Sequence, residues 1–165
     1  MRERYLFGMV MVVIYCMMTG CDKGIAPIED SSATEIYGIS GTIYFSNWPP
    51  VDSVIDLRLV AFVNYPPADI FSEVIQGRAK YTDRLPYAVD SVNYTLIINP
   101  LPPDTIRCIA VGQQYGANIE QDWRLVGIYY TPGDSVIPGR FYVPADSILS
   151  NINIAVDYKK LPHQP

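Results

Sequence analysis

The residues that most often carry chemistry are scarce in this chain. It has one histidine, His163, in the C-terminal segment, and three cysteines, Cys16, Cys21 and Cys108. A Ser-His-Asp or Cys-His device would have to use a histidine near a chain end, where chains fray. A zinc site needs several histidine or cysteine ligands. The sequence therefore predicts neither nucleophilic catalysis with a histidine base nor a zinc centre.

Carboxylates offer the remaining route to catalysis. Asp52, Asp56, Glu120 and Asp122 are candidates for a pair that would hydrolyse a glycosidic bond. However, every acidic chain of this size contains such residues, and most of them are simply solvated. No Asp-rich loop offers the density of oxygen ligands that calcium needs, and no glycine-rich turn leads into a helix to hold phosphate. We therefore expect no enzyme, no metal and no cofactor.

Aromatic residues are abundant, and several stand in polar segments. The chain holds 13 tyrosines and two tryptophans. Planar rings stack on sugars while nearby amides and carboxylates bond the hydroxyl groups. The candidate ligand-binding residues are Trp48, Gln113, Tyr115, Asp122, Trp123 and Tyr129. The alternative is that the tyrosines fill a β core and its strand edges, as β-propensity favours. Residues 112–124 form the best candidate binding loop, and residues 65–86 the second.

The charge pattern argues against a nucleic-acid partner. The formal net charge is −5. The positive residues are scattered, and Lys159-Lys160 is the only adjacent pair. Because nucleic-acid binding needs a clustered basic face, we expect none here.

The N-terminus has the pattern of an exported protein. Arg2 and Arg4 precede an uncharged apolar run at residues 5–18. That run is shorter than the roughly 20 residues that a membrane-spanning helix needs, which is typical of a signal peptide. It ends in Met18-Thr19-Gly20-Cys21, which resembles the lipobox of bacterial lipoproteins. The resemblance implies cleavage before Cys21 and acylation of its thiol, and the lipid would anchor the protein in a membrane.

This pattern divides the chain. Residues 1–20 are predicted to be a lipoprotein signal peptide and residues 21–35 a polar, lipidated tether. The domain would then lie outside the cytoplasm, held at the outer or the inner membrane of a bacterial envelope. The alternatives are an ordinary secretory signal with an incidental cysteine, or a short membrane span. Cys108 would be the one free thiol of the finished protein, and we expect it to be a small buried apolar residue.

From residue 36 onward the sequence alternates as β-strands do. Apolar residues recur at every second position, and β-branched and aromatic types are enriched. The clearest segments are 39–45, 57–63, 94–98, 106–110, 126–130 and 152–158. Prolines and glycines punctuate the gaps. Residues 69–76 are the best helix candidate, with Ile70, Phe71 and Val74 on one face and Gly77 at the end.

The order of these segments resembles that of carboxypeptidase-regulatory-like domains. The opening of such a domain matches Gly41-Thr42-Ile43-Tyr44-Phe45, a proline-containing loop and an apolar strand at 57–63. A later signature matches Tyr94-Thr95-Leu96, then Leu101-Pro102-Pro103-Asp104-Thr105 and a strand at 106–111. The resemblance implies a prealbumin-like (transthyretin-like) antiparallel β-sandwich of about seven strands at residues 36–160, with residues 161–165 as a C-terminal tail. An immunoglobulin-like sandwich is the alternative.

Domains of this family usually have no catalytic residues and serve as accessory or binding modules. We therefore expect a non-catalytic envelope lipoprotein that contacts the membrane through the lipid on Cys21 and contacts another envelope protein through its sandwich. A carbohydrate-binding lipoprotein that uses exposed aromatic residues is the second hypothesis. A carboxylate hydrolase is the third.

Overall fold

The computed structural model describes residues 36–99, 101, 106–133, 138–139, 142–144 and 146–164. All of them belong to the unit Thr34–Pro165. The predicted signal peptide, the tether and the lipidated Cys21 lie outside the described residues. Residues 102–105, which carry part of the family resemblance, also lie outside them.

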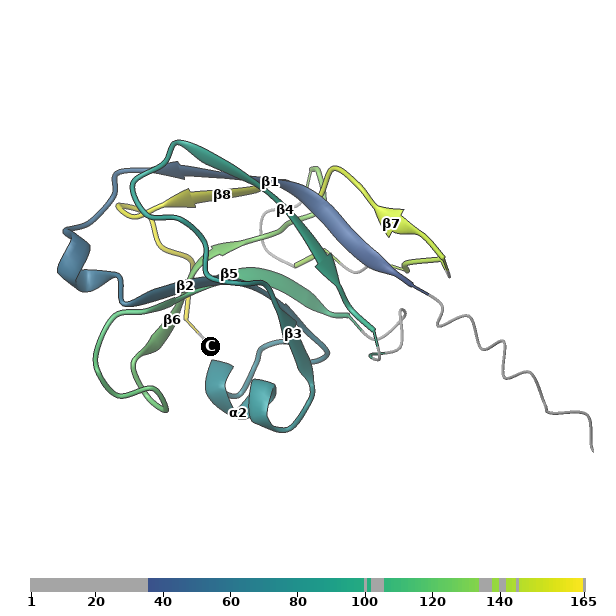
Figure 1. Cartoon of the computed structure of the whole chain (residues 1–165), viewed down its shortest axis with the longest axis horizontal. Coiled ribbons are helices and arrows are strands. Elements are labelled where there is room, and N and C mark those ends of the chain that lie inside the picture. Colours follow the sequence, from purple (N-terminus) through teal and green to yellow (C-terminus); the bar gives the residue numbers. More distant parts are fainter. Residues whose placement is uncertain are drawn as a thin grey trace, which may run out of the picture. The chain divides into compact units, whose positions relative to one another are not determined.

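Eight strands in the described part of the chain form two sheets (Figure 1). The first sheet has the order β4-β1-β7, with β8 also beside β1. The second has the order β3-β2-β5-β6. Their bounds are β1 Gly38–Ser46, β2 Asp56–Phe62, β3 Ala79–Tyr81, β4 Ser91–Ile97, β5 Cys108–Gln114, β6 Trp123–Ile128, β7 Ile148–Leu149 and β8 Ile154–Asp157. One short 3-10 helix, Val51–Ser53, and one α-helix, α2 at Ile70–Ile75, complete the elements. The predicted all-β sandwich is confirmed, with one strand more than expected.

The strand pairings are antiparallel except at β1. Its one edge pairs antiparallel with β4, while β7 and then β8 run parallel along its other edge. Between β7 and β8 the chain turns through Asn151, which has a φ of 66°. That left-handed conformation is one that asparagine tolerates. Two short parallel pairings were not expected from an antiparallel pattern.

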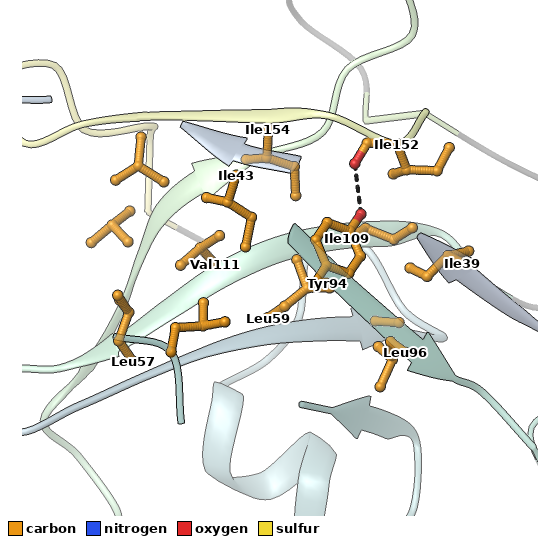
Figure 2. Close-up of a cluster of buried hydrophobic side chains, with 14 of the residues drawn as sticks. Ile39, Ile43, Leu57, Leu59, Tyr94, Leu96, Ile109, Val111, Ile152 and Ile154 are labelled. Atoms are coloured by element: carbon orange, nitrogen blue, oxygen red, sulfur yellow. Dashed lines mark hydrogen bonds between the residues drawn. The ribbon is translucent and has the colours of Figure 1, made fainter. Parts of the chain in front are cut away.

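The apolar positions of the alternating segments meet between the two sheets. Figure 2 shows side chains from both sheets converging on one cluster. Its labelled members are Ile39, Ile43, Leu57, Leu59, Tyr94, Leu96, Ile109, Val111, Ile152 and Ile154. The one polar group among them, the Tyr94 hydroxyl, donates to the Ile152 carbonyl oxygen at 2.6 Å. Each fully buried Leu or Ile side chain contributes about 1.5–3 kcal/mol to stability, so this cluster provides the main driving force for folding.

Strands β2 and β5 are buried on both faces. Leu57, Leu59 and Ala61 point into the inner core, whereas Val60 and Phe62 join a second cluster on the outer face of the sheet. In β5 every residue is buried. Helix α2 supplies Ile70 to the outer cluster and covers part of that face. The helix thus buries the apolar residues on the outer side of β2, Val60 and Phe62.

The predicted side assignment of 126–130 is wrong, because β6 contains a β-bulge. Val111 pairs with Gly127, but its neighbour Gly112 pairs with Leu125, so Val126 is the extra residue. A bulge of this kind shifts the alternation by one position. Val126 therefore packs in the inner core while Ile128 packs in the outer cluster, although both were expected on one side.

Gly41 allows the chain between β7 and β8 to lie close to β1. A Cβ atom at this position would stand 2.1 Å from the Ile152 carbonyl oxygen and 2.6 Å from its carbonyl carbon. Those atoms are backbone, so no rotamer change relieves the clash. Gly112, also in a strand, is different, since a Cβ there would find its nearest neighbour, Ile70 Cδ1, at an ordinary 3.5 Å.

Substitution of Gly41 by alanine should therefore destabilise the sandwich, whereas Gly112→Ala should be nearly neutral. Forcing a methyl group against backbone costs about 1–3 kcal/mol of unfolding free energy, and we expect Gly41→Ala to lie at the upper end of that range. Urea unfolding followed by circular dichroism measures both variants. Equal midpoints for the two variants would contradict the close approach of Ile152 to β1.

Candidate functional site

An apolar groove lies on the outer face of the β3-β2-β5-β6 sheet. It has a volume of about 250 Å³. Helix α2, strand β2, the end of β3, the β5–β6 connection and the start of β6 surround it. The lining residues are Asp56, Arg58, Val60, Ile70, Phe71, Val74, Ile75, Tyr81, Ile119 and Trp123. Eight of these ten are apolar or aromatic, so the groove suits an apolar ligand group.

Helix α2, which forms one wall of the groove, begins and ends at residues that commonly terminate helices. The Asp69 carboxylate caps α2, because its Oδ1 accepts the Ser72 N–H at 3.1 Å. The chain leaves the helix through Gly77, whose φ of 71° is a conformation that glycine adopts at little cost. The predicted helix at 69–76 is thus confirmed. Ile70 faces the sheet, and Ile75 at the rim is 68% exposed.

An ion pair between a buried carboxylate and a partly exposed arginine joins this helix to the residue that precedes β3. The Glu73 side chain is only 1% exposed. Its two oxygens accept from Arg78, Oε2 from Nε at 2.9 Å and Oε1 from Nη2 at 3.0 Å. Asn64 Nδ2 donates to Oε2 at 3.1 Å. One carboxylate therefore joins the segment before the helix, the helix itself and the segment after it.

The same contacts determine the charge state of Glu73. The hydrogen bonds from the Arg78 guanidinium lower the pKa of this carboxyl below its usual value, and the Asn64 amide and the charge of Arg78 act in the same direction. Burial opposes them and is outweighed. Glu73 is therefore a structural anion that holds the wall of the groove.

The β5–β6 connection forms the opposite wall and is closed by its own hydrogen bonds. Asp122 Oδ2 accepts the Asn118 N–H at 2.8 Å, and the Tyr115 N–H donates to the Asp122 carbonyl at 2.9 Å. The Trp123 indole Nε1 donates to the Ile119 carbonyl at 2.9 Å. This bond orients the indole, and Ile119 remains 55% exposed at the rim.

The groove has one polar end. Arg58 Nε lies 2.7 Å from Asp56 Oδ2, and its guanidinium carbon lies 5.3 Å from the centre of the Tyr81 ring. These two contacts keep the Arg58 side chain between Asp56 of β2 and Tyr81 of β3. The Tyr81 ring is 46% exposed, so it offers a surface at this end.

The six predicted binding residues do not form one site. Trp123 lines the groove, and Asp122 shapes the loop next to it. Gln113 is buried at the end of β5, where it donates to the Ser53 carbonyl and accepts from Arg124 Nε at 3.0 Å. Tyr115 is exposed and carries the Arg124 guanidinium over its ring at 5.3 Å. Of these residues, Gln113 uses both its side-chain nitrogen and its side-chain oxygen in hydrogen bonds within the protein.

Trp48 and Tyr129 lie elsewhere, packed against the inner core. The Trp48 ring contacts the rings of Phe45, Tyr87 and Tyr158, with centroid distances of 4.7, 5.0 and 5.1 Å. Its indole N–H donates to the Val89 carbonyl at 2.8 Å. Trp48 is therefore a partly buried residue that packs against the core, as the alternative for the aromatic residues predicted.

The sequence did not single out Ile75, Ile119, Tyr81 and Arg58 as site residues. Ile75 offered a signal, because it stands beside the apolar face of the predicted helix and not on it. Ile119 offered another as an isolated apolar residue in a polar loop. Neither signal says which other segment the residue approaches, so the groove as a whole is visible only in three dimensions.

The other candidates for chemistry are placed as follows. Cys108 is fully buried, and burial raises the pKa of its thiol to about 12, as expected for a small apolar residue. His163 is exposed. Among the described residues, no three histidine, cysteine or acidic side chains come together as metal ligands would. No helix in the same part of the chain is both long and apolar enough to cross a bilayer.

The segment expected as a tail lies against the sandwich. Leu161 packs against the inner core. The Gln164 side-chain amide bonds the backbone of Leu125 twice, donating from Nε2 to the carbonyl at 2.9 Å and accepting the N–H on Oε1 at 2.8 Å. A primary amide carries the same donor and acceptor as a peptide unit, so Gln164 imitates one residue of a neighbouring strand.

The described residues thus define a two-sheet β-sandwich with a helix-covered outer face and an apolar groove beside that helix. Comparison with protein-family models, with curated proteins and with solved structures found no match.

Acidification should weaken the wall of the groove through Glu73. Because the folded pKa of Glu73 lies below its unfolded value of 4.5, the stabilisation is complete above that value and is lost as the pH falls through the lowered folded pKa. We expect the unfolding free energy of the parent to decrease below about pH 4.5 more steeply than that of Glu73→Gln. Urea unfolding at a series of pH values measures this difference. Glu120→Gln, which removes an exposed carboxylate, is the matched control and should keep the parent's slope.

Proposed function

We propose that this chain is a non-catalytic lipoprotein of the bacterial cell envelope whose β-sandwich binds another envelope protein. The lipid on Cys21 would hold it at the outer or inner membrane, with residues 21–35 as the tether. The order of the alternating segments along the sequence resembles that of carboxypeptidase-regulatory-like domains, which supports an accessory or binding role. In this proposal the domain is prealbumin-like.

The observation that carries the binding role is the groove beside α2. Ile75 and Ile119 stand on opposite walls with most of their surface exposed. Exposed apolar groups gathered around a concave surface are typical of a protein-binding site, because water leaves them when a partner is bound. The Arg58–Asp56 pair at one end would orient the partner.

The second candidate is carbohydrate binding, favoured by the two aromatic rings that line the same groove. Tyr81 and Trp123 both contribute to its surface. Rings of this kind stack on the apolar faces of sugars. Trp48, Gln113 and Tyr129 do not contribute to this candidate, since they are packed or bonded within the domain.

A photo-crosslinking amino acid placed at position 75 in intact cells tests whether the groove binds another protein. We expect one envelope protein to be crosslinked, and we expect Ile119→Glu to reduce its yield about tenfold, because a carboxylate cannot be desolvated against an apolar partner. Val51→Glu, at an exposed apolar position outside the groove, is the control and should leave the yield unchanged.

Two results would decide against the protein-binding role. The first is a crosslinking yield that Ile119→Glu leaves unaltered. The second is a saturable change in tryptophan fluorescence on titration with envelope oligosaccharides that is lost in Trp123→Phe, which would favour carbohydrate binding instead.

The anchor is tested separately. The Cys21→Ser variant should move from the membrane fraction to the soluble fraction, because the thiol that carries the lipid is gone. Cys16→Ser, within the predicted signal peptide, should remain in the membrane fraction. Mass spectrometry of the N-terminal peptide reads the modification directly, and an unmodified Cys21 would overturn the lipoprotein assignment.

A further inference from the structure

No described strand pairs with the outer edge of β4. In the described part of the chain β4 pairs only with β1. The Ile98 N–H donates to Tyr37 and the Asp90 carbonyl accepts from Phe45. Since bonded pairs alternate in an antiparallel ladder, the even-numbered residues of β4 bond to β1. The N–H and C=O groups of Ser91, Asn93, Thr95 and Ile97 therefore point away from the sheet.

This edge lacks the features that usually prevent further pairing. Proteins protect such edges with charged residues, prolines, bulges or short strands. The seven residues of β4, SVNYTLI, include no charge and no proline. Its register with β1 runs from Gly38↔Ile97 to Tyr44↔Ser91 without a shift.

The other edges of the described sandwich are protected. Strand β3 has three residues and contains Lys80, and β7 has two residues. Strand β6 is bulged, and Gln164 occupies the N–H and C=O of Leu125. Strand β8 lies against β6, where a Cβ on Gly127 would stand 2.7 Å from Val156 Cγ2. The contrast singles out β4.

A hollow of about 460 Å³ runs beside this edge. Residues 92–97 line one side of it and residues 81–86 the other. The latter segment continues alongside β2, because Thr82 donates to the Leu59 carbonyl at 3.0 Å and Leu85 to the Leu57 carbonyl at 2.7 Å. The hollow therefore lies between the edges of the two sheets, on one open side of the sandwich.

We propose that the free edge of β4 binds an extended, uncharged segment of a partner protein as an additional strand, with alternate side chains of that segment entering the hollow beside residues 81–86. Main-chain bonds to Ser91, Asn93, Thr95 and Ile97 provide the affinity, and the hollow selects the side chains. β-Branched residues fit best, since they pair well with Asn93 and Thr95 on the exposed face.

The hollow also explains why the occupant is a free segment and not a second copy of this chain. The alternate side chains of β4 that face inward, Tyr94 and Leu96, are buried in the chain's own core. A second copy pairing through β4 would have no side chains available to fill the hollow. In a segment that is unfolded before binding, the side chains on one face of the new strand are free to enter the hollow.

The test uses the full chain, extracted in detergent, and a blocked heptapeptide of alternating valine and threonine. Methylation of every second amide nitrogen of the peptide leaves one edge able to bond and prevents the peptide from associating with itself. Calorimetric titration should show saturable binding, and amide exchange of residues 91–97 should slow. The same peptide methylated at every amide should not bind.

The matched variants are Thr95→Pro and Thr95→Val. Proline is tolerated in an edge strand when its nitrogen faces solvent, so Thr95→Pro should fold while losing one free donor. We expect it to bind the peptide at least about tenfold more weakly, whereas Thr95→Val, which keeps the N–H, should bind as the parent does. Circular dichroism and thermal unfolding check that both variants are folded.

Ile75→Glu, in the groove beside α2, should leave peptide binding unchanged, so failure of this proposal is separable from failure of the proposed function. Three outcomes of the peptide titrations overturn the proposal: no saturable binding of the half-methylated peptide, equal binding by Thr95→Pro and the parent, or binding of the fully methylated peptide. Sedimentation as a dimer that Thr95→Pro dissociates would assign the edge to a second copy and would also overturn it.

Discussion

The outer face of the β3-β2-β5-β6 sheet is apolar and has to be covered. Val60, Phe62 and Cys108 would otherwise place a continuous apolar surface in water. The segment between β2 and β3 provides the cover, and one buried carboxylate holds it in place. The buried carboxylate of Glu73 would lie uncompensated in the interior without Arg78, so the pair penalises any arrangement that separates its members. Glu73 thus determines where the cover lies, and the groove forms where the cover ends.

Ile75 lies at the limit of that cover, on the rim of the groove. Helix α2 has only six residues and forms one wall of the groove. The remaining gap is bounded by Ile119 and Trp123, whose positions depend on the hydrogen bonds of Asp122 and the indole N–H. Two independently anchored segments therefore meet around an unfilled apolar surface.

Much of the fold was visible in the sequence, because alternation and punctuation are local signals. The alternating segments became β1, β2, β4, β5, β6 and β8, and the helix formed where Asp69 and Gly77 mark its ends. The bulge at Val126 was not predictable, since it arises from the pairing of β6 with β5. The parallel pairings of β7 and β8 depend likewise on contacts between residues far apart in the chain. For the candidate site, Trp123 was found by residue type, whereas Trp48 has the same type and packs against the inner core and other rings. Composition does not say which of two partly buried rings lines a groove.

The burial of the Cys108 thiol has a consequence for its reactivity. Thiolate is the form that reacts with oxidants and with disulfides, and with a pKa of about 12 hardly any of it exists near neutrality. The sulfur is also shielded by the outer cluster on its own side of the sheet. A cysteine introduced on the surface of the sandwich would therefore accept a maleimide label without competition from Cys108.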